Sequence, residues 1–201
     1  MMEISQRVSP KLSQTSNNIF LNEKLLARVK SIYDKKEQLN LSTEDAKLLE
    51  DLYESFKANG ATLNKDDKEK YRKLSMDLSM LTLQFDQNAL KDKNRFELLI
   101  TDENELSGLP ESARDAAAML AKSKDKNGWL FNLSAPSYIP FMRYSDKRDL
   151  REKMYREYMS VGNKGDEFDN KDIIKKIVNI RLEIAQLMRF KSCAECALED
   201  T

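Results

Sequence analysis

Apolar residues recur at spacings of three and four along most of this 201-residue chain, and this period most constrains its fold. Such spacing places apolar side chains on one face of an α-helix and leaves charged residues on the other face. Only five glycines and four prolines interrupt the pattern. We therefore predict a mainly α fold, a multi-helix antiparallel bundle joined by short turns. The clearest stripes lie in residues 22–39, 42–60 and 146–159 and in the stretches that begin at Asn64 and Asp169.

Short polar residues mark where these helices begin and end. Ser42 precedes Asp45 by three residues, which is the spacing of a capping box. Asn64 is followed closely by two acids, which the helix macrodipole favours in a first turn. Gly60 suits the left-handed conformation that ends a helix. The pattern predicts helices that begin after Ser42 and after Asn64.

The helical period stops after residue 93, where a small β insert is predicted. Residues 95–100 and 129–133 are short aromatic and aliphatic runs bounded by Asp, Asn and Gly, which is typical of strands. Between them, Pro110 suits the first position of a helix that continues through an alanine-rich stretch to Ala121. Two strands with a helix between them predict a two-stranded sheet.

These patterns divide the chain into three ranges. Residues 1–93 are predicted to form a helical bundle, and residues 146–201 a further helical segment. Residues 94–145 hold the strand-helix-strand insert and a proline-flanked segment. Pro136 and Pro140 are expected to flank a tight segment there, before the helices resume.

The chain contains no histidine, which excludes a Ser-His-Asp triad, a Cys-His dyad and a zinc site with imidazole ligands. Its 34 basic and 34 acidic residues balance, whereas a nucleic-acid-binding surface shows a basic excess. No apolar run approaches the roughly 18 residues that a membrane span needs. We expect no nucleic-acid or membrane partner. We also expect no catalytic, cofactor-binding or metal-ligating residue in this chain.

Cys193 and Cys196 form a Cys-x-x-Cys pair, and no other cysteine is present. Ser192 and Glu195 have capping-box spacing and place the pair at a helix N-terminus, where the dipole lowers a thiol pKa. A thioredoxin-like site needs a preceding strand, however, and zinc needs a second pair of ligands. We interpret the cysteines as packing residues and keep a thiol-redox function as the weakest alternative. So few cysteines favour a reducing compartment, the cytoplasm, with the periplasm as the alternative.

Clustered acids are a further candidate for chemistry. They occur at positions 44–45, 66–67 and 102–103, at predicted helix starts or turns, where acids cap helices. Residues 166–169 resemble a calcium loop only in part, because a glycine precedes the acids and no bidentate Glu follows at the twelfth position. We interpret all four clusters as capping or loop residues.

Several stretches, in order along the chain, carry a family resemblance. They are 21–25 (Leu-Asn-Glu-Lys-Leu) with 27–30, 109–112 (Leu-Pro-Glu-Ser), 136–141 (Pro-Ser-Tyr-Ile-Pro-Phe), and 169–174 with Arg181, Ala185, Phe190, Ala194 and Glu195. By their order and spacing, residues 5–200 resemble the N-terminal portion of a zinc metallopeptidase. The family is that of thimet oligopeptidase, oligopeptidase A and bacterial peptidyl-dipeptidase, and the last is the nearest resemblance.

The resemblance implies a helical wall of a deep channel that admits short peptides, from which peptidyl-dipeptidases release C-terminal dipeptides. It places one zinc ion in the other half of the parent protein, on a His-Glu-x-x-His helix and a further glutamate. There zinc lowers the pKa of an attacking water. None of those residues has a counterpart here. The chain is therefore expected to be a non-catalytic fragment, whose residues 146–201 lead toward the absent catalytic half.

The partners expected from the resemblance are that catalytic half and, for the parent, short peptides. Apolar surface facing the missing half would also favour self-association. The alternative is a free-standing helical module that binds a protein partner. Arg189 stands where relatives usually have glycine, and a positive φ there would strain it by about 1 kcal/mol. Cys193 and Cys196 stand where polar or tyrosine residues are common in the family, which counts against a redox role.

Overall fold

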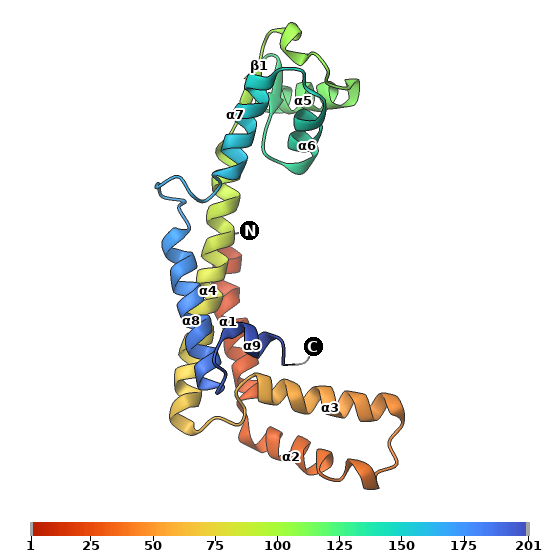
Figure 1. Ribbon diagram of the computed structural model, residues 1–201, viewed down its shortest axis with the longest axis vertical. Helices are drawn as coiled ribbons and strands as arrows, with labels where there is room; N and C mark the ends of the chain where they lie inside the picture. Colours follow the sequence, from red (N-terminus) through yellow and green to blue (C-terminus); the bar gives the residue numbers. More distant parts are fainter. Residues whose placement is uncertain (1, 200–201) are drawn as a thin grey trace. The chain divides into compact units, whose positions relative to one another are not determined.

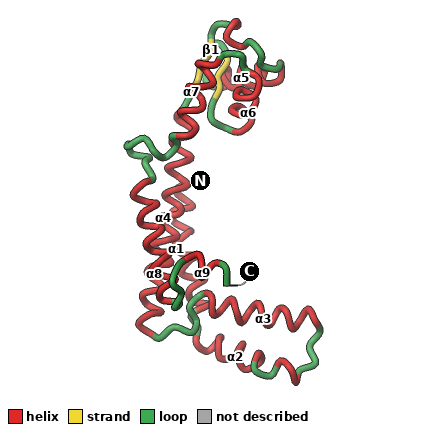
Figure 2. Tube along the Cα trace, viewed as in Figure 1, coloured by secondary structure: helices red, strands yellow, loops and turns green. Residues whose placement is uncertain are grey.

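The computed structural model describes residues 2–199, which form helices joined by short loops and two short strands (Figures 1 and 2). The predicted mainly α fold with a small two-stranded β insert is confirmed. Among these residues no helix combines the length and apolar character needed to cross a membrane. Asp200 and Thr201, the end of the last predicted helical range, lie outside the described residues.

The chain divides into two compact units. The first holds the residues up to Gln84 together with those from Ile173 onward, and the second is Phe85–Asp172. Both divisions fall inside helices. The sequence ranges 1–93, 94–145 and 146–201 are a division by pattern and stay a prediction.

The described part of the first unit is helical. Its elements are α1 (Met2–Phe20), α2 (Glu23–Tyr33), the 3₁₀ turn η1 (Lys36–Gln38), α3 (Thr43–Ala58), most of α4 (Lys65–Arg95), most of α8 (Lys171–Leu187) and α9 (Cys193–Ala197). Helix α4 runs beside α1 and α8, and α2 pairs with α3 (Figure 1). The helix predicted over 22–39 ends earlier, at Tyr33, and a 3₁₀ turn follows it.

The spacing of apolar residues did not predict α1, and its contacts explain why. Asn17 donates to Ser75 on α4 (2.8 Å), and the hydroxyls of Ser9 and Ser79 lie 2.8 Å apart. Because α1 meets α4 partly through polar side chains, its inner face lacks the stripe by which amphipathic helices are recognised. Pro10 inside the helix weakens the pattern further.

The predicted caps are present. Ser42 Oγ accepts a hydrogen bond from the amide of Asp45 (3.1 Å), and Asn64 Oδ1 accepts one from the amide of Asp67 (2.9 Å). Gly60 follows α3 with φ +80°, in the left-handed region. These local signals depend on neighbours three or four residues away, so the sequence alone was enough to find them.

Helix α8 ends in a Schellman motif that places Arg189 in the left-handed conformation. The amide of Phe190 donates to the carbonyl of Ala185 (2.9 Å), and that of Arg189 donates to the carbonyl of Gln186 (3.0 Å). Arg189 has φ +67°, so this position has the positive φ that strains the backbone of a residue other than glycine. A Cβ atom is unfavourable in this conformation, and glycine has none.

We expect Arg189→Gly to raise the free energy of unfolding by about 0.5–1 kcal/mol, since relief of strain exceeds the extra freedom that glycine brings to the unfolded chain. Urea unfolding followed by circular dichroism measures the change. Arg189→Ala keeps the Cβ atom and is the matched control, with no gain expected. A gain of equal size in both variants would show that the arginine side chain, and not its backbone conformation, is unfavourable.

The second unit packs a small sheet against helices. Strands β1 (Leu98–Ile100) and β2 (Trp129–Phe131) form an antiparallel pair, with Leu98 opposite Phe131 and Ile100 opposite Trp129. The core beneath the sheet gathers Leu106, Leu133, Phe141 and Met154, all buried. Besides the last residues of α4, the elements are β1 (Leu98–Ile100), η2 (Glu103–Leu106), α5 (Glu111–Ser123), β2 (Trp129–Phe131), α6 (Ala135–Tyr144) and α7 (Arg148–Met159).

The expectation for Pro136 and Pro140 is wrong, because both lie inside α6. Pro136 sits in the first turn, where an amide has no helical acceptor to lose. Pro140 does lose one helical hydrogen bond, and the next residue, Phe141, packs edge-to-face on Phe131 with ring centroids 4.7 Å apart. Burial of Phe141 holds this turn in the helix despite the proline.

Candidate functional site

The Cys-x-x-Cys pair lies at the start of the five-residue helix α9, and both thiols are free. Ser192 Oγ accepts a hydrogen bond from the amide of Glu195 (3.1 Å), and the Glu195 carboxylate accepts one from the amide of Lys191 (2.6 Å). Burial raises the pKa of the Cys196 thiol. A reactive thiol needs a lowered pKa, so the environment of Cys196 favours the packing interpretation. For Cys193 that interpretation is wrong, because its side chain is exposed at the first position of the helix.

The acidic clusters do not come together. Among residues 2–199, no three cysteine or acidic side chains form a group that could hold a metal ion. Asp45 and Asp67 cap helices, and Asp102 accepts a hydrogen bond from the amide of Asn104 (2.9 Å). The described residues therefore do not fit the zinc ion that the family resemblance implies for the parent protein.

A buried carboxylate that the sequence analysis missed organises the loop between α7 and α8. Asp92 of α4 is fully buried and accepts hydrogen bonds from the amide of Gly162 (2.7 Å) and from Lys164 Nζ (3.1 Å). Arg95 Nε lies 2.7 Å from the same carboxylate. In the sequence Asp92 stands within a charged run, which is typical of a solvated face. Its spacing of seven from Phe85, on the predicted apolar stripe, is the signal that could have found it.

Two buried asparagines hold the same loop on α4. Asn170 donates from its side chain to the carbonyl of Phe85 (3.0 Å) and accepts a hydrogen bond from Asn88 (3.1 Å). Its own amide donates to the carbonyl of Gly162 (2.7 Å). Gly162 has φ +70°, and a Cβ atom there would lie 3.0 Å from Asn170 Nδ2. The two ends of the loop are thus fixed to each other and to one helix.

The acidic residues at 166–169, where the sequence resembles a calcium loop in part, are bound by other residues of the same chain. Asp166 forms an ion pair with Arg95, whose guanidinium lies 5.2 Å from the centre of the Phe168 ring. Asp169 accepts hydrogen bonds from the amides of Lys171 (2.9 Å) and Gly165 (2.6 Å). The bond from the Lys171 amide is the main cause that lowers the pKa of Asp169 to about 2. Their arrangement is that of a structural loop.

We expect the loop contacts of Asp169 to be lost only in strong acid. Its pKa in the folded chain is about 2, below the ordinary value of 3.8, so its contribution is complete above about pH 4 and disappears as the pH falls through 2. In an NMR titration, the amide proton of Gly165 should shift with a midpoint near 2. Asp169→Asn is the control and should abolish that shift. A midpoint near 3.8 would mean that the hydrogen bonds do not form in solution.

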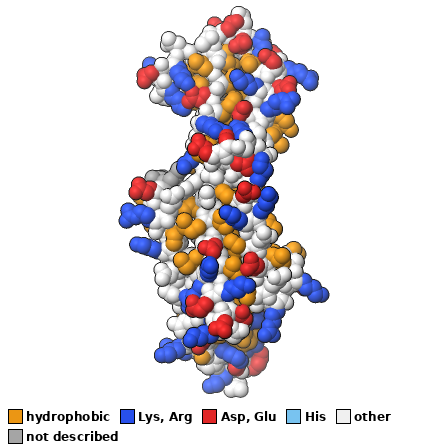
Figure 3. Space-filling model, turned by 90° about the vertical axis from the view of Figure 1, so that its left-hand side faces the viewer, with side chains coloured by type: hydrophobic (Ala, Val, Ile, Leu, Met, Phe, Trp, Pro, Cys, Tyr) orange, Lys and Arg blue, Asp and Glu red, His pale blue; other side chains and the backbone are white. Residues whose placement is uncertain are grey.

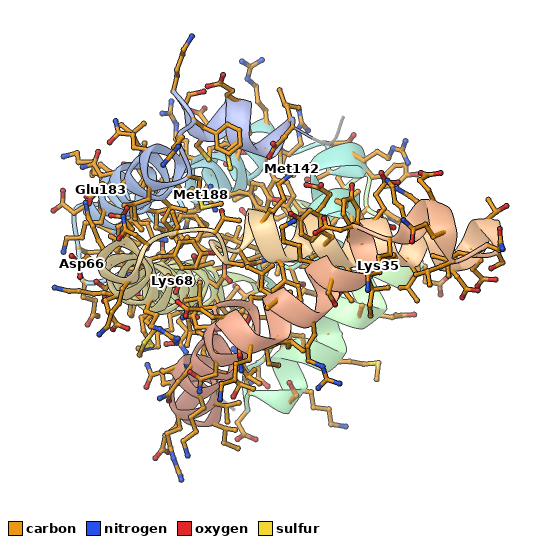
Figure 4. All side chains as sticks on the ribbon, turned by 90° about the horizontal axis from the view of Figure 1, so that it is seen from below. Lys35, Asp66, Lys68, Met142, Glu183 and Met188 are labelled. Carbon is orange, nitrogen blue, oxygen red and sulfur yellow. The ribbon has the colours of Figure 1, made fainter. Side chains whose placement is uncertain are left out.

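Helices α1 and α8 leave apolar side chains exposed on the first unit. Beside α8, a groove toward α4 is lined by Met80, Leu81 and Ile180 together with polar residues. Lys70 of α4 and Glu183 of α8 form an ion pair (3.6 Å), where the two helices lie side by side (Figure 4). The exposed stripes are Ile4, Val8 and Leu12 on α1, and Ile174, Val178 and Leu182 on α8. Among the described residues, these exposed apolar stripes are therefore the feature that indicates a function, as surfaces for contact with another protein segment.

Comparisons with known proteins agree with the resemblance. A family profile described as Peptidase family M3 matches residues 141–201. Oligopeptidase A of Salmonella typhimurium is 33% identical, with 98% of this chain and 30% of that protein aligned. Dipeptidyl carboxypeptidase of Escherichia coli is 30% identical, with 100% of this chain and 30% of that protein aligned.

A plant protein matches as well. Probable cytosolic oligopeptidase A of Arabidopsis thaliana is 36% identical over 84% of this chain and 25% of its own length. Peptidyl-dipeptidase was expected to be nearest, whereas the oligopeptidases A share the higher identities. The chain spans about 30% of the length of the curated relatives that it matches.

Proposed function

Since the chain belongs to peptidase family M3, we propose that it is the helical N-terminal part of a zinc-dependent oligopeptidase that removes C-terminal dipeptides from short peptides. In this proposal it forms one wall of the substrate channel and is not catalytic alone. The observation that carries the proposal is the alignment, which includes 98% of this chain but 30% of a related oligopeptidase. The zinc ligands and catalytic residues would belong to the part outside these 201 residues.

The residues of the chain support a role as a wall. It has no histidine, and residues 2–199 contain no group of acids and cysteines that could hold a metal ion. Side chains cap α2, α3 and α4 at their first turns, and the loop between α7 and α8 is fixed through buried Asp92 and Asn170. A rigid wall keeps folded proteins out of a channel and leaves short peptides as substrates.

We expect the purified 201-residue chain to show no peptidase activity on a short fluorogenic peptide, with or without added zinc. The matched control is the protein encoded by the complete reading frame, for which zinc-dependent release of a C-terminal dipeptide is expected. Removal of zinc by a chelator should abolish that activity, and readdition should restore it. Activity in the isolated chain that a chelator abolishes would contradict the proposal.

The reading frame after Thr201 is the sharper test. The proposal requires it to stay open and to encode His-Glu-x-x-His, the motif that the resemblance implies. A stop codon directly after Thr201 would contradict the proposal and favour the alternative, a helical module that binds a protein partner. The proposal also places the oligopeptidase in the cytoplasm, in line with the name of the probable cytosolic relative from Arabidopsis thaliana.

A further inference from the structure

The chain contains two Asn-Gly pairs, Asn59–Gly60 and Asn127–Gly128, and in such pairs asparagine loses its side-chain amide most readily. The reaction requires the main-chain amide nitrogen of the glycine to reach Cγ of the asparagine, and glycine has no Cβ atom to obstruct that approach. Asparagine is counted among the thermolabile residues. Whether a given pair reacts depends on how firmly the fold holds its two amide groups.

The first pair is held by the last turn of α3. Asn59 Nδ2 donates to the carbonyl of Ser55 (2.8 Å), and the main-chain amide of Asn59 donates to the same carbonyl (3.1 Å). The amide of Gly60, which is buried, donates to the carbonyl of Lys57 (3.0 Å). The attacking nitrogen and the amide under attack are both bound to backbone carbonyls, so this pair can react only after the end of α3 opens.

The second pair is exposed and not held in this way. Asn127 lies at the surface, in the turn between α5 and β2. Within residues 2–199, neither the side chain of Asn127 nor the main-chain amide of Gly128 has a hydrogen-bond partner. Gly128 has φ +111°, and a Cβ atom there would collide with the carbonyl of Ile100. The fold therefore requires glycine at this position and leaves both reacting amides free.

The charges around this turn cancel. Lys124 and Lys126 both pair with Glu97, and Asp125 lies between the two lysines in the sequence. A similar mixture of acidic and basic side chains covers the face of the molecule in Figure 3. Since no excess charge of either sign lies in the turn, we expect the freedom of the two amide groups to set the reaction rate.

We propose that Asn127 is a site of spontaneous deamidation, which converts it to isoaspartate and aspartate while Asn59 stays intact. The amide nitrogen of Gly128 loses its proton to solvent and forms a bond to Cγ of Asn127. The bond from Cγ to the side-chain nitrogen breaks, and ammonia leaves with protons from solvent. Water then opens the cyclic imide at either of its carbonyl carbons. Water is the co-reactant, and no electrons are transferred.

Isoaspartate at position 127 would disturb the start of β2. It forms when water attacks the main-chain carbonyl carbon of the imide, so that the backbone then runs through the former side chain and gains a carbon atom. The next residues are Gly128, which lies against the carbonyl of Ile100, and Trp129, which lies opposite Ile100 in the sheet. An additional backbone atom directly before a short strand displaces these contacts. Trp129 is the only tryptophan in the sequence, so its fluorescence reports the change.

Ageing of the purified 201-residue chain at neutral pH and physiological temperature tests the proposal. Peptide mass mapping follows deamidation at positions 59 and 127 while the circular dichroism signal stays helical, and each rate is divided by the rate at the same position in urea. We expect this ratio to be at least about 10-fold higher at position 127, because position 59 must first break its hydrogen bonds. Equal ratios at the two positions would overturn the proposal.

The products and two variants test the route through the imide. A methyltransferase that transfers a methyl group from S-adenosylmethionine to isoaspartate measures that product. Asn127→Gln should remove most of the methyl acceptance, because glutamine would have to form a larger ring. Asn59→Gln is the matched control and should leave the methyl acceptance unchanged. Aspartate at position 127 without isoaspartate would indicate direct hydrolysis and overturn the proposed route.

The effect on β2 is tested with freshly purified Asn127→Asp, which adds the new charge without lengthening the backbone. Tryptophan emission of the original chain should shift as isoaspartate accumulates, whereas Asn127→Asp should keep the emission of the fresh chain. An equal shift in both would assign the effect to the charge and overturn the role of the longer backbone. No shift in the aged chain would overturn the disturbance of β2. All of these measurements are independent of peptidase activity, so they stand whether or not the proposed function does.

Discussion

Asp92→Ala is expected to lower the free energy of unfolding of the second unit by about 3–5 kcal/mol, because it leaves buried partners without their acceptor. The carboxylate accepts hydrogen bonds from the Gly162 amide and from Lys164, and it pairs with Arg95. Loss of one partner from a buried ionic network leaves the others desolvated and unpaired. Urea unfolding measures the change, and hydrogen exchange at Gly162 locates it.

The matched control for Asp92→Ala is Glu157→Gln, which removes the other acid that contacts Lys164 (2.7 Å). Glu157 lies at the surface, where an ion pair contributes at most about 1 kcal/mol. Burial opposes the charge of Lys164, but the hydrogen bonds that its ammonium donates to Glu157 and Asp92 outweigh burial and raise the pKa of Lys164. If the two variants lose equal stability, the buried position of Asp92 is not the source of its effect.

The second large effect is expected for Phe141→Ala, at about 3–5 kcal/mol. Phe141 is fully buried in the core of the second unit and packs edge-to-face on Phe131. Its removal leaves a cavity beside Met154 and takes away the contact that holds α6 across Pro140. Thermal and urea unfolding measure the loss, and the helical circular dichroism signal should fall with it.

Ile139→Ala is the control on the same helix. Ile139 is 57% exposed, so its truncation should change stability by no more than about 0.5 kcal/mol. A similar loss in both variants would mean that α6 depends on helix propensity near its prolines and not on burial of Phe141.

The sequence predicted the elements that local signals define. Ser42 and Asn64 cap their helices through residues three positions away, so their effect is visible in the sequence. The two-stranded sheet of β1 and β2 also followed from two short apolar runs, whereas its antiparallel direction was not predicted. Helix α6 was not predicted, because proline inside a helix removes a backbone hydrogen bond and usually disfavours the helix. Burial of Phe141 outweighs this effect of its prolines. Packing partners distant in sequence override local propensity in such cases.

The organisation of the α7–α8 loop could not be predicted from nearby residues. Asp92 meets Gly162 seventy positions later, and Asn170 meets Phe85 eighty-five positions earlier. A polar residue on an apolar stripe indicates that its side chain has a buried hydrogen-bond partner. The sequence does not show which residue that partner is. For Arg189, by contrast, the family resemblance identified a position where relatives usually have glycine, and the residue there has a positive φ.

The first unit is discontinuous in the chain, which affects how the protein folds during its synthesis. Residues 85–172 separate α4 from the part of α8 that packs beside it, and a ribosome needs roughly 4–18 s to add them. The second unit is continuous and can fold as soon as it leaves the ribosome. Throughout that interval, α4 lacks the neighbouring helix α8, whose Glu183 pairs with Lys70 in the complete unit. The order of the chain therefore creates a period in which a chaperone can bind the first unit.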